Sequence, residues 1–109
     1  MRAVIKDIIQ SKTAAFHNEG LLVYELLDKA YRSKEPIEIS FYGIDRCATQ
    51  FLNASIGKMY LQYDPSTLNN LIRYDYGQVP HLIEKIEEVK SNAIHSKMYD
   101  ALIDNATSH

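Results

Sequence analysis

The sequence has few of the residues that mark most catalytic and metal sites. It contains one cysteine, Cys47, so no disulfide can form within the chain, and we expect a reducing compartment. Its four histidines are scattered, and no two have the His-x-x-x-His spacing of a zinc site. The four glycines stand apart from one another, which excludes the glycine-rich loops that hold nucleotide phosphates. We therefore expect no catalytic residue, no metal and no cofactor.

Strong charge and long apolar segments are also missing. Twelve basic and fourteen acidic side chains give a net charge of −2, and no basic cluster is present that would attract nucleic acid. No segment approaches the roughly 20 apolar residues that span a bilayer, and the N-terminal apolar run is too short for a signal peptide. With 109 residues, 46% of them hydrophobic, the chain is expected to form a single domain over residues 1–109. We expect it in the cytoplasm, without a nucleic-acid or membrane partner.

The hydrophobic pattern alternates between the periods of strands and helices. Strands are expected over residues 2–9, 37–42 and 71–76. Helices are expected over residues 21–31 and 49–60, and from Pro80 onward as the first helical residue. Residues 10–20 are interpreted as a loop, and Asp64-Pro65-Ser66 as a turn. This order predicts an α/β fold, with a small mixed β-sheet and helices mainly on one face.

Cys47 lies just before the helix expected from Thr49, where helix amides would stabilise a thiolate. A cysteine nucleophile also needs a base, and the arginine that follows the cysteine of a phosphatase loop is missing here. We therefore favour burial of Cys47 as a small core residue. A small enzyme that uses Cys47, or the His17–Glu19 loop, is the alternative.

Thr49 is the main candidate for a functional residue in the sequence. As the N-cap of its helix, its hydroxyl would accept a hydrogen bond from an amide one turn further on. An exposed hydroxyl at a helix N-terminus is also where a phosphate is best tolerated, because the amides and the helix dipole favour an anion. The residue types alone favour the role of a cap over that of a phosphoacceptor.

The segment IEISFYGIDRCATQFLNASIGKMY resembles the centre of a bacterial STAS-like domain family of unknown function. That family has a hydrophobic strand, a Phe-x-Gly-Ile turn and then Thr-x-Phe-Leu-Asn-x-x-Ile-Gly. The turn corresponds to residues 41–44 of this chain, and the second motif to residues 49–57. The similarity also includes Asn18-Glu19-Gly20 and the later helix around residues 89–93, so it extends over nearly the whole chain.

The resemblance implies a non-enzymatic docking and regulatory module, distantly similar to anti-anti-sigma factors and to the STAS domains of sulfate transporters. In the anti-anti-sigma branch an ATP-binding partner kinase phosphorylates a Ser or Thr at the position of Thr49, and the complex then dissociates. The expected partner is thus an ATP-binding kinase or an anti-sigma-like protein. We expect it to contact the loop and the helix start, namely Gly43, Ile44, Asp45, Arg46, Cys47, Ala48 and Gln50 around Thr49.

Two other interpretations of the sequence are open. In the phosphorylated branch an Asp precedes the acceptor and a small residue follows it, whereas Ala48 and Phe51 occupy those positions here. Docking without phosphorylation is therefore an alternative to the switch. A homo-oligomeric structural component, with a homodimer that pairs through the Tyr42 face of the strand, is another.

Overall fold

The computed structural model describes the backbone of residues 1–107 and the side chains of residues 1–98. Its centre is a three-stranded sheet in the order β1-β3-β5, formed by β1 (Arg2–Val4), β3 (Ile37–Ser40) and β5 (Ile72–Asp75). Both strand pairs are parallel. The predicted α/β class is therefore confirmed, but the sheet is parallel rather than mixed. Helical segments connect each strand to the next, and such crossovers return the chain in the same direction.

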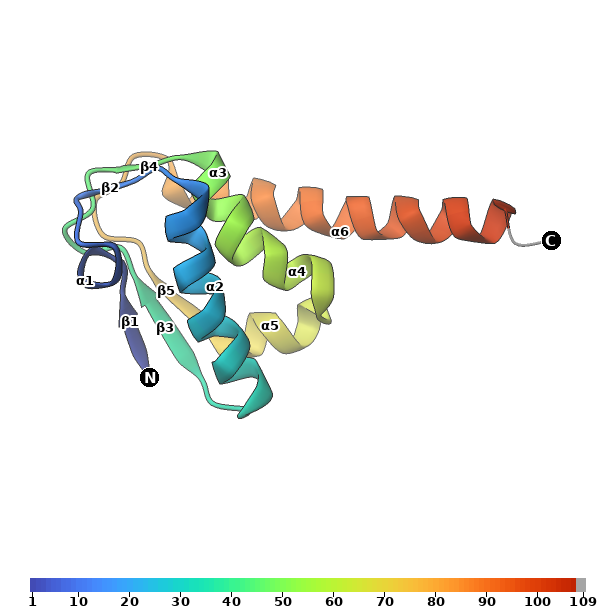
Figure 1. Cartoon of the computed structure of the whole chain (residues 1–109), viewed down its shortest axis with the longest axis horizontal. Coiled ribbons are helices and arrows are strands. Elements are labelled where there is room, and N and C mark those ends of the chain that lie inside the picture. Colours follow the sequence, from blue (N-terminus) through green and yellow to red (C-terminus); the bar gives the residue numbers. More distant parts are fainter. Residues whose placement is uncertain (108–109) are drawn as a thin grey trace.

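Helices cover the sheet and give the molecule its layered form (Figure 1). The elements between β1 and β3 are α1 (Ile5–Ile9), β2 (Thr13–Ala14) and α2 (His17–Arg32). Between β3 and β5 lie β4 (Arg46–Cys47), α3 (Thr49–Leu52), the π-helical turn η1 (Asn53–Gly57), α4 (Lys58–Gln62) and α5 (Pro65–Leu71). The last helix, α6 (Leu82–Thr107), projects beyond the rest of the fold (Figure 1). Of the helices in the described range, none is long and apolar enough to cross a membrane.

The buried side chains form one cluster between the sheet and the helices. Ile37, Ile39 and Phe41 are fully buried, as their alternation along β3 predicts. The helical stripes predicted over 49–60 and in the last helix are buried as well. They consist of Leu52, Ile56, Met59, Tyr60, Leu82, Ile86, Val89 and Ala93.

Several predicted boundaries are wrong. Only residues 2–4 of the predicted first strand are extended, because the chain turns into α1 at Ile5 and buries that side chain. The predicted loop over 10–20 contains β2 and the first turn of α2. Asp64 is the N-cap of α5 rather than part of a simple turn, since its carboxylate accepts from the Thr67 amide at 3.0 Å. Pro80 precedes the last helix, which begins at Leu82.

A polar network ties the three strands together. Ser40 is fully buried on the central strand, and its hydroxyl donates to Asp75 Oδ2 at 2.9 Å. Arg2 Nη2 donates to both Ser40 Oγ and the same carboxylate, at 3.1 Å each. The Ser40 hydroxyl, the Gly77 amide and the Arg2 guanidinium together lower the pKa of Asp75 from its usual value. The ionised carboxylate therefore stabilises the folded state.

The Asp75 network predicts how stability depends on pH. Because the pKa of Asp75 is lower in the folded than in the unfolded chain, its contribution is complete above the unfolded pKa of about 4. It is lost as pH falls through the lower, folded pKa. We expect Asp75→Asn to lower the free energy of unfolding at pH 7 and to have progressively less effect below about pH 4. Urea unfolding of both proteins from pH 7 to pH 3 measures this, and a difference that stays constant with pH would contradict it.

Candidate functional site

Two helices begin side by side at one end of the fold. The short strands β2 and β4 pair in parallel, with Ala14 opposite Cys47. The Ala48 amide then donates to Ala14 O at 2.8 Å, so the chain enters α2 and α3 from adjacent positions (Figure 1). Gly20 allows the two helices to pack closely, since a Cβ atom there would lie 2.5 Å from Phe51 O. The positive ends of the two helix dipoles therefore lie at the same end of the fold (Figure 1).

The two helix starts differ in how they are capped. At α2 the Glu19 carboxylate accepts from the amide of Phe16 at 3.1 Å and from that of Ala15 at 3.4 Å. The start of α3 has neither a side-chain cap nor an acidic residue in its first turn. Its positive end is thus left for an external anion or an acceptor on a partner, whereas that of α2 is already neutralised.

Thr49 lies at this uncapped start, but its position differs from the prediction. The N-cap is Ala48, with φ −85° and ψ 149°, and Thr49 is the first helical residue. The side chain of Thr49 is exposed, and within the described part of the chain its hydroxyl makes no hydrogen bond. The predicted role of Thr49 as the cap is therefore wrong. Its hydroxyl has no structural function that would compete with a role in recognition.

The other predicted contact residues fall into two groups. Asp45, Arg46 and Gln50 are exposed, and Gly43 and Ala48 are half-buried. Ile44 and Cys47 are both 3% exposed, so their side chains belong to the core and cannot contact a partner. Cys47 is the second residue of β4 and Ile44 lies just before that strand, and both side chains belong to the hydrophobic core cluster.

Phe16 lies on the same surface, but it was not among the contact residues predicted from the sequence. Its side chain is 64% exposed, and Gln50 Nε2 donates to the neighbouring Ala15 O at 2.6 Å. This bond joins the start of α3 to the loop that carries Phe16. An apolar residue immediately before the polar stretch His-Asn-Glu was the available signal. We call Phe16 together with the exposed and half-buried residues of the 43–50 segment the helix-end surface; these are Gly43, Asp45, Arg46, Ala48, Thr49 and Gln50.

Cys47 is a core residue, as favoured from the sequence, and not a stabilised thiolate. Burial raises the pKa of its thiol to about 12, against a smaller lowering by the nearby Lys85 ammonium. Lys85 Nζ donates to the carbonyl oxygen of Cys47 at 3.2 Å, so it holds the backbone of β4 rather than the sulfur. At neutral pH almost all of this thiol is protonated.

We expect Cys47 to react slowly with thiol reagents. Its folded-state reaction with iodoacetamide at pH 7.5 should be at least about 100-fold slower than in urea, because the thiol is buried and its thiolate is scarce. Mass spectrometry after timed quenching measures both rates. A folded-state rate close to that of the unfolded chain would restore Cys47 as a candidate nucleophile.

The remaining candidates do not assemble into a site. His17 and Glu19 belong to the first turn of α2 and not to a loop, and Glu19 is engaged in capping. Across the residues that the structure describes, no group of three or more His, Cys, Asp or Glu side chains lies together. His109 is outside those residues. Tyr42 is 69% exposed but lies two residues beyond β3, whose two edges are both paired, so it offers no open strand edge.

Comparison with known proteins agrees with the resemblance. The family model described as a STAS-like domain of unknown function (DUF4325) matches residues 19–75, just over half of the chain. The matched region begins in the first turn of α2 and ends with β5, so it includes the whole start of α3. The similarity seen around residues 89–93 lies outside it. No curated protein and no solved structure matches the chain.

Proposed function

This chain belongs to the family of STAS-like domains of unknown function, and on that premise we propose that it is a non-enzymatic regulatory module that binds a protein partner through its helix-end surface. One observation supports this most directly. Thr49 is exposed on a helix start that has no cap and no acidic residue in its first turn. The amides of Ala48 and Phe51 already donate to backbone carbonyl groups, so the first turn of α3 can offer its remaining amides to an anion or an acceptor on another molecule.

The composition of the surface fits a protein partner. It combines the exposed ring of Phe16 with the polar side chains of Arg46, Thr49 and Gln50. Protein interfaces are enriched in aromatic residues and arginine, which anchor binding at the centre of the contact. The bond from Gln50 to Ala15 O and the pairing of β2 with β4 hold these groups on ordered backbone, which lowers the entropy lost on docking.

A phosphoryl switch at Thr49 is the regulatory part of the proposal. An ATP-binding partner kinase would transfer the γ-phosphoryl group of ATP to Thr49 Oγ1, so that the new O–P bond replaces the bond to ADP and the hydroxyl proton is released. The phosphate would lie near the first amides of α3, where the dipole favours it. The fold would remain intact while a partner that fits the neutral surface would meet a dianion.

Capture from cells tests this proposal. We expect a protein that co-purifies with the tagged wild type to be lost from Thr49→Glu. Ser66→Glu is the matched control, because Ser66 is also an exposed hydroxyl residue in the first turn of a helix, α5. A partner that remains on Thr49→Glu would show that docking takes place elsewhere. A partner lost from both variants would indicate a nonspecific effect of charge.

A further inference from the structure

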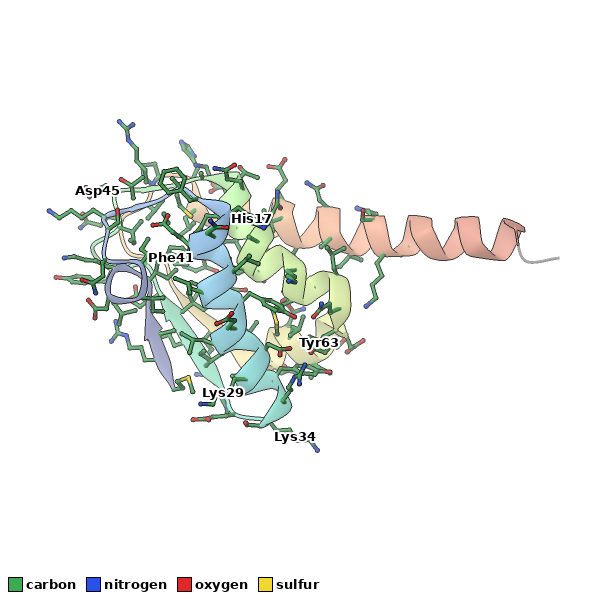
Figure 2. All side chains as sticks on the ribbon, in the orientation of Figure 1. His17, Lys29, Lys34, Phe41, Asp45 and Tyr63 are labelled. Atoms are coloured by element: carbon green, nitrogen blue, oxygen red, sulfur yellow. The ribbon has the colours of Figure 1, made fainter. Side chains whose placement is uncertain are left out.

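A groove of about 700 Å³ lies at the carboxyl ends of the parallel strands. One side is lined by Lys6 and Lys12, a second by residues 42–45 after β3, and a third by residues 77, 78 and 80 after β5. These loops gather beside α1, β2 and β4 in Figure 1, and Figure 2 shows Asp45 at the same end of the molecule. Ligands of open parallel sheets bind outside the carboxyl ends of the strands, and this volume is typical of small-molecule sites. We call it the carboxyl-end groove.

The charge of the groove favours an anion. Its lining contributes two ammonium groups, from Lys6 and Lys12, against one carboxylate, from Asp45. In the described part of the chain neither lysine takes part in an ion pair. With two positive charges and one negative, the lining of the groove carries a net charge of +1, in a chain whose net charge is −2; Asp7 lines an adjoining pocket with the same two lysines.

The walls of the groove are held in place before any ligand arrives. The Tyr42 amide donates to Ser40 Oγ at 3.3 Å, and the Gly77 amide donates to Asp75 Oδ1 at 3.2 Å. Since Ser40 and Asp75 are themselves bonded, the loops after β3 and β5 are fixed to one another. A preorganised site loses less conformational entropy on binding.

Because residue 43 is a glycine, the aliphatic part of the Lys6 side chain can lie against the backbone of the loop after β3. Gly43 has φ +80°, and a Cβ atom there would lie 2.8 Å from Lys6 Cδ and 3.4 Å from its ammonium nitrogen. Any larger residue would push the Lys6 side chain away from its present position. The loop after β3 therefore helps to set the direction of one of the two charges of the groove.

We propose that the carboxyl-end groove binds a small organic phosphate. The phosphate group would lie between the ammonium groups of Lys6 and Lys12, which together match its double charge. The rest of the molecule would contact the ring of Tyr42, which is 69% exposed. The volume exceeds what a single inorganic ion fills, so the groove has room for an organic part. The groove shares Gly43 and Asp45 with the helix-end surface, but ligand binding to the isolated chain does not require partner docking at Thr49.

Titration calorimetry at low ionic strength, with phenyl phosphate as the probe, tests this site. We expect saturable binding of one molecule per chain, weaker binding of inorganic phosphate, and none of phenol. The double variant Lys6→Gln/Lys12→Gln should weaken binding at least about 10-fold, because two charge-assisted contacts are lost. Tyr42→Ala should weaken the binding of phenyl phosphate but leave the binding of inorganic phosphate unchanged.

Lys29→Gln/Lys34→Gln is the matched control. It removes the same charge from exposed lysines near the end of α2, far from Asp45 (Figure 2), and should bind as the wild type does. The proposal is overturned if the wild type shows no saturable binding, or if both double variants lose affinity equally. If circular dichroism shows that Lys6→Gln/Lys12→Gln does not fold, the site is located instead by the changes that phenyl phosphate causes in the amide chemical shifts of the wild type. Shifts at Gly43 and Gly77 support the groove, and shifts elsewhere refute it.

Discussion

Gly20→Ala is expected to unfold at a temperature about 10 °C below that of the wild type. The new Cβ atom would lie 2.5 Å from Phe51 O and 2.7 Å from Ala54 Cβ. Because Phe51 O belongs to the backbone, it cannot rotate aside as a side chain does, and α2 must move away from α3 and η1. Overpacking of this kind costs about 1–3 kcal/mol, and a backbone contact belongs at or above the upper end of that range. Alanine recovers about 1 kcal/mol of helix propensity, which leaves a net loss of roughly 2 kcal/mol.

Gly57→Ala provides the comparison for this prediction. It makes the same change in another helical segment, but its Cβ would meet Val89 Cγ1 at 3.0 Å, which is a longer contact and involves a side chain rather than the backbone. Both substitutions gain the same helix propensity, so the difference between them reflects the contact that each new Cβ atom makes. We therefore expect a smaller decrease in the midpoint of thermal unfolding than for Gly20→Ala. Calorimetry measures both. If Gly20→Ala were as stable as the wild type, the close approach of α2 to α3 that places the two helix starts together would be wrong.

Thr49→Glu is expected to raise the dissociation constant of the captured partner at least about 10-fold. The added carboxylate places a charge at the centre of the helix-end surface, where it must be desolvated on docking. The change leaves the fold intact, since the exposed Thr49 side chain has no hydrogen bond to lose within the described part of the chain. Surface plasmon resonance of the purified pair gives the constant, and circular dichroism checks the fold.

Thr49→Val separates docking from phosphorylation. It preserves the shape of the side chain and removes the hydroxyl, so it cannot accept a phosphoryl group. We expect its affinity for the partner to stay within about threefold of the wild type, because one exposed hydrogen bond contributes little. Incubation with ATP and the kinase should then weaken the wild-type complex and leave the Thr49→Val complex unchanged. Weakening of both would place the modification at another residue.

Where side-chain pattern alone determines burial, the sequence was informative. The alternation of Ile37, Ile39 and Phe41 specified β3, because successive side chains of a strand point to opposite faces. The buried stripe after β4 was also predicted from a 3.6-residue period, although the π-helical turn η1 that interrupts this segment was not predicted. The α5 helix was missed although its signals were present, since Asp64 as N-cap and Pro65 as first helical residue are a recognisable start.

Features that depend on distant pairing could not be read from the sequence. The α1 helix is too short to show a helical period, so the predicted first strand was drawn through it. The parallel sense of the sheet, in contrast, agrees with the predicted alternation of strands and helices, which does not itself favour a mixed sheet. Nothing local shows that Ala48, rather than Thr49, would be the N-cap, because the pairing of β2 with β4 sets where the helix begins. The carboxyl-end groove likewise exists only once the loops after β1, β3 and β5 meet.

Hydrogen–deuterium exchange of the domain, alone and with the captured partner, tests the central claim most directly. We expect slower exchange in the complex at amides of residues 43–52 and around Phe16, because these form the helix-end surface and the first turn of α3. Peptides from α5, which lies away from that surface in Figure 1, should exchange at the same rate in both states. Protection confined to α5 or α6, with residues 43–52 unchanged, would contradict the claim that this helix end is where the partner binds.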